Sequence, residues 1–186
     1  MKRLFVAIGI LFSQPMFCSA VTGSDTTTVA VIKNGENFSF ERVIQTPSQT
    51  KDVLYKKAKA WVLSTMKTAD QNISYDEENF KIVNSGAKSI DPKKNSAAFL
   101  ISEGYFNFKI LFEFKDGKYR VKIDNFEIFT RANTGFQVKD KTRTYAELSD
   151  NKEGKYIREQ IDEKLTSLIR SLNGSLVSSE QKNSDW

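Results

Sequence analysis

The stretch FLISEGYFNFKILFEFKDGKYRVKIDNFEIF, residues 99–129, decides the fold that the rest of the chain completes. Apolar and polar residues alternate on both sides of Asp116-Gly117, which is the pattern of two half-buried strands. An Asp-Gly pair supplies the two positive backbone φ angles that a tight two-residue hairpin requires. The sequence therefore predicts an antiparallel hairpin that turns at residues 116–117.

The turn also predicts which residues of the two strands face each other. On one side of the hairpin the opposite residues are all aromatic or aliphatic: Phe114 with Tyr119, Phe112 with Val121, and Ile110 with Ile123. On the other side Glu113 faces Arg120, and opposite charges across a strand pair favour this register.

The apolar alternation changes phase between Ile123 and Phe126. One extra residue at Asp124-Asn125 restores the alternation, which predicts a β-bulge at this point. The pairs expected beyond the bulge are Phe108 with Phe126 and Phe106 with Ile128. Because each aromatic or branched pair contributes about 0.2–1 kcal/mol relative to an alanine pair, we expect this hairpin to organise the fold.

Two helices are predicted, one on each side of the hairpin in the sequence. The first begins after the capping residue Thr50 and has an apolar stripe: Leu54, Ala58, Trp61, Val62 and Met66. The second has apolar residues at spacings of three and four, namely Ile157, Ile161, Leu165, Leu168, Ile169 and Leu172. Asn173-Gly174 is a natural helix stop, so the second helix is predicted to end there.

The remaining segments predict shorter elements. Strands are expected over residues 38–43, 71–75, 80–84 and around 142–145, and a polar loop over residues 86–97. The resulting fold class is α+β with the order β-α-β(4 or more)-α, in which both helices pack on one face of a curved antiparallel sheet. Trp61 and Leu165 are expected to meet the aromatic row of the hairpin. The domain is predicted over residues 38–172, after a flexible leader (21–37) and before a disordered polar tail (173–186).

The first 20 residues have the pattern of an export signal. Lys2 and Arg3 precede the apolar run of residues 4–12, and Cys18-Ser19-Ala20 has the form of a cleavage site. Cleavage near Ala20 predicts a periplasmic or secreted protein, and acylation of Cys18, which would anchor the chain to lipid, is the alternative. The apolar run is about half the roughly 20 residues that span a bilayer, so no transmembrane helix is expected.

The composition narrows the functional classes. The chain has no histidine, and its single cysteine lies in the predicted signal, so the mature chain lacks two common metal-binding and nucleophilic residues. Without Lys2 and Arg3, the 28 basic residues fall to 26 against 23 acidic ones, a net charge of +3. We therefore expect no enzyme activity, no metal or other cofactor, and no nucleic-acid partner.

Two segments carry a family resemblance. Residues 51–61, KDVLYKKAKAW, and residues 115–121, KDGKYRV, resemble the signature stretches of a bacterial family of exported domains of unknown function. The resemblance covers residues 38–130 and implies a fold like that of the TATA-box-binding protein (TBP). The family has no assigned activity, so no catalytic or binding residue carries over, and DNA binding does not transfer with the fold.

With both helices on one face of the sheet, the other face has no cover in this chain. The residues expected there are Tyr105, Asn107, Lys109, Leu111, Arg120 and Lys122. An uncovered face with Tyr, Leu and Arg favours a non-catalytic binding module of the cell envelope with a protein or glycan partner. The alternative is a carrier that holds an apolar small molecule between the sheet and the C-terminal helix.

Overall fold

The computed structural model describes residues 32–34, 37–66, 73–94, 100–133 and 137–177. The elements are, in chain order, β1 (Ile32–Asn34), β2 (Asn37–Gln45), α1 (Lys51–Thr65), β3 (Ile73–Asp76), β4 (Lys81–Ser89), β5 (Lys93–Lys94), β6 (Leu100–Ile101), β7 (Glu103–Lys115), β8 (Lys118–Asn133), β9 (Val138–Thr144), the short 3-10 turn η2 (Tyr145–Glu147) and α2 (Lys152–Val177). The predicted order of strands and helices is confirmed. The predicted signal peptide (1–20) and residues 178–186 of the predicted tail lie outside the described residues.

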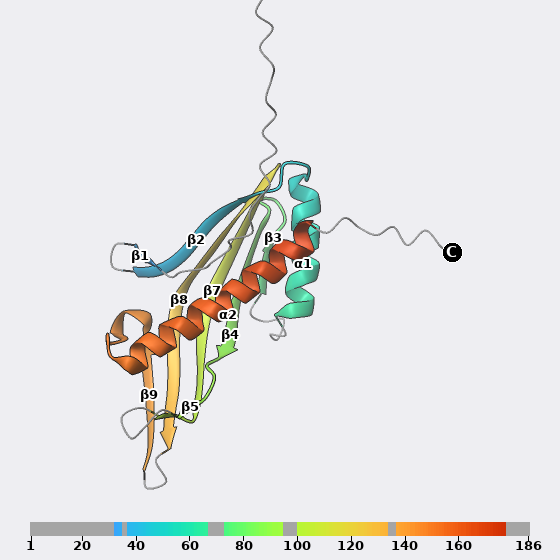
Figure 1. Ribbon diagram of the computed structural model, residues 1–186. Coiled ribbons are helices and arrows are strands. Elements are labelled where there is room, and N and C mark those ends of the chain that lie inside the picture. The colour runs from blue at the N-terminus through green and yellow to red at the C-terminus, as the bar shows by residue number, and fades with distance from the viewer. Residues whose placement is uncertain (1–31, 35–36, 67–72, 95–99, 134–136, 178–186) are drawn as a thin grey trace, which may run out of the picture.

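The main sheet is open and antiparallel, with the strand order β1-β2-β8-β7-β4-β3 (Figure 1). Strand β9 also pairs with β8. Because β8 is 16 residues long, two strands share its outer edge: residues 118–123 pair with β2, and residues 127–133 pair with β9. The β7–β8 hairpin therefore lies in the middle of the sheet, and β5 and β6 form a separate two-stranded sheet.

The hairpin has the predicted register except at the register shift, where the expected pair of Phe108 with Phe126 is not formed. Phe114 faces Tyr119, Phe112 faces Val121, Ile110 faces Ile123, and Phe106 faces Ile128. Of the two turn residues expected to have a positive φ, only Gly117 has one, at 74°, whereas Asp116 does not. Lys109 faces Asp124 whereas Asn107 faces Glu127, so β8 contains one extra residue at this point, and Asn125 has a φ of 55°. The predicted bulge is confirmed.

Helix α1 is anchored to the hairpin turn at its first residues. The Thr50 side chain accepts a hydrogen bond from the backbone N–H of Val53, as expected for a capping residue. The backbone N–H of Lys51 donates to Asp116 Oδ1 at 2.8 Å, so the turn also satisfies a free donor of the helix. Further along α1, the Trp61 ring meets the Phe112 ring edge-on, with 6.1 Å between ring centroids.

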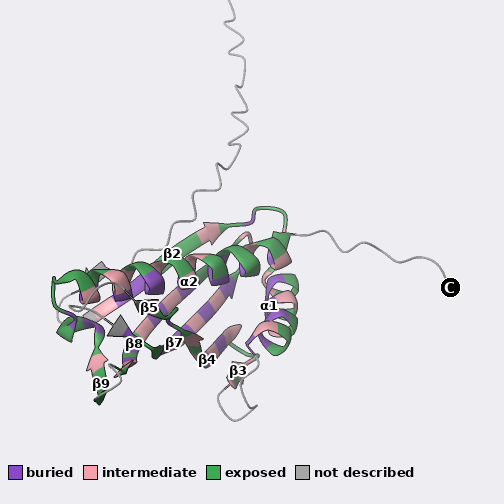
Figure 2. Ribbon diagram, turned by 60° about the horizontal axis from the view of Figure 1, so that its bottom comes forward, coloured by how far each residue is buried: buried purple, intermediate pink, exposed green. Residues whose placement is uncertain are grey.

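Both helices pack on the same face of the sheet (Figures 1 and 2). The hairpin residues on that face form one row, and each is at most 3% exposed: Phe106, Phe108, Ile110, Phe112 and Phe114. Trp61 Nε1 on α1 donates to Ser171 Oγ on α2 at 3.1 Å, which joins the two helices over this row. Leu165 of α2 is fully buried.

The predicted end of α2 at Asn173-Gly174 is wrong, because the helix continues to Val177. Leu176 in this extra turn is fully buried, and its carbonyl oxygen accepts hydrogen bonds from the side chains of Gln49 and Lys57. These contacts with the segment around α1 stabilise the last turn, and they join residues more than 100 positions apart, which the local pattern does not reveal. Residues 173–177, which were predicted to belong to the polar tail, therefore lie in α2.

Three shorter segments also differ from the sequence prediction. Strand β4 continues to Ser89, into the predicted polar loop, because Gly86 leaves room for the Phe108 ring, whose Cζ would lie 2.7 Å from a Cβ at residue 86. Strand β9 begins at Val138 and ends before Tyr145, which lies in η2. Most of β9 is exposed on both faces, so it lacks the apolar alternation that marks a half-buried strand. Strand β1 lies in the predicted leader.

Replacement of Gly174 tests the corrected helix end. Space around the residue is open, since apart from its chain neighbours and the adjacent helix backbone no atom of the described residues lies within 4 Å of a Cβ built there. Gly174→Ala should raise the free energy of unfolding by about 0.5–1 kcal/mol, because alanine loses less backbone entropy than glycine in a helix. Urea-induced unfolding followed by circular dichroism measures the change. An unchanged or lower midpoint would show that residue 174 is not inside a stable helix.

Replacement of Gly117 tests the hairpin turn in the opposite direction. Its φ of 74° is the left-handed conformation, which a side chain disfavours. We expect Gly117→Ala to lower the free energy of unfolding by about 1 kcal/mol in the same urea experiment. A midpoint equal to that of the unmodified protein would contradict the turn geometry.

Candidate binding face

The face of the sheet opposite the helices is called the open face here. Residues alternate between the two faces along a strand, so the side chains that neighbour the buried row in sequence lie on the open face. The structure places all six predicted residues there: Tyr105, Asn107, Lys109, Leu111, Arg120 and Lys122. Among them Tyr105 is a large exposed hydrophobic residue, at 41% exposure.

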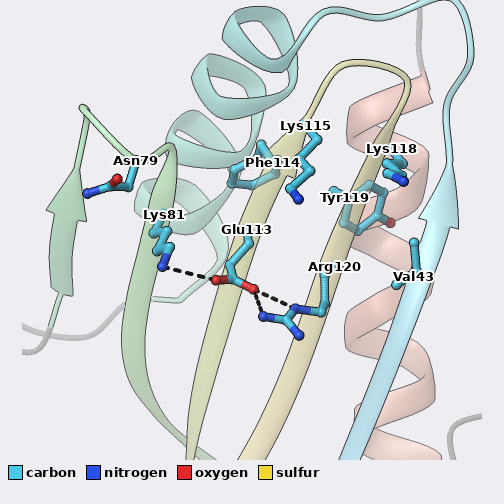
Figure 3. Close-up of a pocket in the computed structure, with 9 residues that line it drawn as sticks. All are labelled: Val43, Asn79, Lys81, Glu113, Phe114, Lys115, Lys118, Tyr119 and Arg120. Carbon is cyan, nitrogen blue, oxygen red and sulfur yellow. Dashed lines mark hydrogen bonds and ion pairs between the residues drawn. The ribbon is translucent and has the colours of Figure 1, made fainter.

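One chain of ion pairs crosses four neighbouring strands on the open face. Glu113 on β7 contacts Lys81 on β4, with 3.2 Å between Nζ and Oε1, and also pairs with Arg120 on β8. Arg120 in turn contacts Glu41 on β2, with 3.2 Å between its NH1 nitrogen and Oε1. Figure 3 shows Lys81 and Arg120 on opposite sides of the Glu113 carboxylate. The predicted pairing of Glu113 with Arg120 is confirmed.

The surroundings of Glu113 favour its charged form. Partial burial disfavours the carboxylate, but the hydrogen bonds and positive charges of Arg120 and Lys81 outweigh that cost and hold the pKa of Glu113 below its ordinary value. The hydrogen bond to Glu113 is also the main cause that raises the pKa of Arg120. Both groups therefore stay ionised at neutral pH.

Other charged residues of the open face are also paired. Lys122 contacts Asp124 at 3.0 Å, and Asn107 Nδ2 donates to Glu127 Oε2 at 3.1 Å. Arg131 is held from two sides, by Asp140 at 2.8 Å and by Glu103 at 2.9 Å. The Lys122–Asp124 pair lies within β8, whereas the contacts of Asn107 and Arg131 join neighbouring strands, and together they hold several polar side chains of the face in defined positions.

An aromatic pair lies near the far end of the open face from the hairpin turn. The rings of Tyr105 and Phe129 are stacked, with 5.0 Å between centroids and 24° between planes. The Arg131 guanidinium lies 5.5 Å from the Phe129 ring centroid, within the range of a cation–π contact. Phe129 is not among the residues predicted on this face from the sequence. The bulge could have revealed it, because the extra residue turns odd-numbered residues of β8 toward the open face beyond residue 125.

Two hollows open on this face. The first, here called the hairpin-end pocket, has a volume of about 350 Å³, and its nine lining residues are labelled in Figure 3. The second, the bulge pocket, has a volume of about 580 Å³ and lies where β2 and β9 diverge along β8. Its lining includes the aromatic residues Phe38, Phe126 and Tyr145 and the charged residues Lys109, Lys122 and Asp124. A third hollow, of about 310 Å³, lies between α1 and the β3–β4 turn.

Among the residues that the structure describes, no three side chains of His, Cys, Asp or Glu lie close enough together to hold a metal ion. In the same residues, no helix combines the length and the apolar character that crossing a membrane requires.

Replacement of Glu113 tests the ion-pair chain. We expect Glu113→Gln to lower the free energy of unfolding at neutral pH by up to about 1 kcal/mol. Because the pKa of Glu113 is lowered in the folded protein, this contribution is complete above its ordinary pKa of 4.5 and is lost as the pH falls through the lowered value. Urea unfolding of both proteins at a series of pH values measures the difference.

The matched control is Glu159→Gln, which removes a carboxylate from an exposed position of α2. This variant should stay close to the unmodified protein at every pH. A Glu113→Gln difference that does not shrink in acid would contradict the proposed stabilisation of the Glu113 carboxylate.

A family model and two solved structures are similar to this chain. Residues 40–129 match the family model described as a domain of unknown function (DUF4468) with TBP-like fold. A crystal structure of a DUF4468 family protein from Bacteroides ovatus is similar, with a TM-score of 0.62, 18% identity and coverage of 85% of this chain and 98% of that one. A TBP-like protein from Parabacteroides distasonis gives a TM-score of 0.65, 11% identity and coverage of 81% and 99%.

Among curated proteins, none matches the sequence. The two solved structures are less than 25% identical to the chain, so they show the fold alone. That fold is the predicted α+β arrangement of an open antiparallel sheet and two helices. Residues 40–129 of the chain thus match the model of the DUF4468 family, a domain of unknown function with a TBP-like fold.

Proposed function

We propose that the protein is a non-catalytic binding module of the bacterial cell envelope that recognises a protein or glycan partner through the open face. The stacked aromatic pair of exposed Tyr105 and half-buried Phe129 carries this proposal. Both helices lie on the other side of the sheet, and Tyr105 is 41% exposed on the open face.

The composition around the pair fits a recognition surface. Tyrosine, phenylalanine and arginine are enriched at the centres of interfaces, because they combine a large apolar area with a polar or charged end. Tyr105, Phe129 and Arg131 form such a group within one end of the open face. Asp140 and Glu103 hold Arg131, so its position is fixed before a partner arrives, which lowers the entropy cost of binding.

The ion pairs on the rest of the face support the same function. A buried charge without a partner costs free energy at an interface, whereas a charge already paired inside the protein can stay at a solvated rim. On this face Arg120, Lys122 and Arg131 each contact a carboxylate of the chain. Affinity would therefore come mainly from the aromatic pair.

The envelope location rests on the sequence pattern of residues 1–20, a basic start followed by an apolar run and a small-residue cleavage site. The absence of histidine and of a cysteine beyond residue 18 supports a function without catalysis. The alternative function, a carrier between the sheet and α2, lacks similar support. None of the three hollows described above has a lining residue from α2.

Replacement of Tyr105 tests the proposal. Immobilised mature protein would be exposed to the envelope fraction of the source organism and to an array of its surface glycans. Once a partner is identified, we expect Tyr105→Ala to weaken its binding at least about tenfold, as truncation of an interface anchor does. Isothermal titration calorimetry measures the affinity, and thermal unfolding checks the fold.

The matched control is Leu63→Ala. Leu63 is 54% exposed on α1, outside the open face, so its truncation removes a similar exposed apolar side chain without touching the proposed surface. This variant should bind the partner as the unmodified protein does. Equal affinities for the Tyr105→Ala and Leu63→Ala variants would overturn the proposal.

A further inference from the structure

We propose that the hairpin-end pocket binds an oxyanion, meaning a carboxylate, sulfate or phosphate group, and that Lys115 and Lys118 hold it. The inference rests on the proposed function, because it gives the chemistry of one end of the same open face. The pocket volume of about 350 Å³ lies within the range of small-ligand sites.

The charges that line this pocket are unbalanced. Four cationic side chains, Lys81, Lys115, Lys118 and Arg120, surround the single carboxylate of Glu113. Figure 3 shows Lys115 and Lys118 on the two strands above the ion pair of Glu113 and Arg120. A concave site with a net excess of positive charge concentrates anions.

Within this group, the two lysines differ from the other cations. Lys81 and Arg120 share Glu113, and Arg120 also contacts Glu41. Lys115 and Lys118 face each other directly across the hairpin, and in the described part of the chain neither side chain has a carboxylate partner.

The nearest carboxylate in the sequence is already engaged. Asp116 Oδ1 accepts the backbone N–H of Lys51 at the start of α1. Like charges placed directly opposite each other destabilise a strand pair. A bound anion between the two ammonium groups would remove this repulsion, so the binding of an oxyanion should also stabilise the fold.

The pocket also has apolar walls. Val43 is 50% exposed on the open face, and the largely buried rings of Phe114 and Tyr119 complete the lining. The Tyr119 hydroxyl is directed to Asn173 Oδ1 on α2, at 3.5 Å, and so faces away from the open face. The ligand expected here is therefore an oxyanion on a small body with one apolar side, such as a sugar acid.

Nuclear magnetic resonance titration of the full mature chain tests the site, with inorganic phosphate and D-glucuronate as probes at low ionic strength. We expect saturable shifts of the backbone amides around residues 79–81 and 113–120. The affinity should fall as salt is added, because exposed ammonium groups are screened. The double variant Lys115→Ala/Lys118→Ala should weaken binding at least about tenfold.

The control is Lys152→Ala/Lys155→Ala, which removes the same charge from exposed positions at the start of α2. It should leave the affinity unchanged. Linear, non-saturable shifts, or equal losses in both double variants, would show that only general electrostatic attraction acts and would overturn the inference. Vesicles that contain anionic lipid distinguish a lipid headgroup from a soluble oxyanion as the ligand. Binding to these vesicles without binding to phosphate or glucuronate would also overturn the inference.

Tyr105→Ala separates this inference from the proposed function. This variant should bind phosphate and glucuronate normally, because Tyr105 lies at the other end of β7 from the pocket. Partner binding that depends on Tyr105 without saturable oxyanion binding would overturn the inference alone. Oxyanion binding that depends on the two lysines, with partner binding insensitive to Tyr105, would overturn the proposed function alone.

Discussion

The cross-strand register of β7 and β8 is the constraint on which the other parts of the structure depend. Side chains alternate along a strand, so a slip of one residue would turn the buried aromatic row toward water and the charged residues toward the helices. Asp116-Gly117 sets this register through its turn conformation. Asp116 Oδ1 also accepts a hydrogen bond from the backbone N–H of Lys51, the first residue of α1. The same turn therefore determines where the helix begins over the buried aromatic row.

The bulge at Asn125 has a second effect on the sheet. It divides β8 into one half that pairs with β2 and another that pairs with β9, and the bulge pocket lies at the division. The extra residue also exchanges the two faces along β8. Without that exchange Phe129 and Arg131 would point toward α2, and Tyr105 would have no ring to stack on. A single inserted residue therefore creates the aromatic pair.

The sequence predicted what depends on neighbours in the chain. The hairpin register, the bulge and the Thr50 cap follow from local pattern, and the six open-face residues follow from the register. The last turn of α2 depends instead on contacts with Gln49 and Lys57, which are distant in sequence. The pairing of Arg120 with Glu41 depends on the position of β2 beside β8, which no local pattern indicates.

The ion pairs determine which parts of the open face can recognise a partner. Where neighbouring strands supply opposite charges, the face is already neutral, and a partner gains little by replacing one internal pair with another. Lys109 lacks a carboxylate partner in the described part of the chain, and at the two ends of the face two groups differ from this pattern: the Tyr105–Phe129 pair and the two lysines at the hairpin turn. Tyr105 and Lys115 are ten residues apart on β7, a distance of roughly 34 Å at the rise of an antiparallel strand. A small ligand can therefore contact only one of these groups, and only an extended or macromolecular partner can use both.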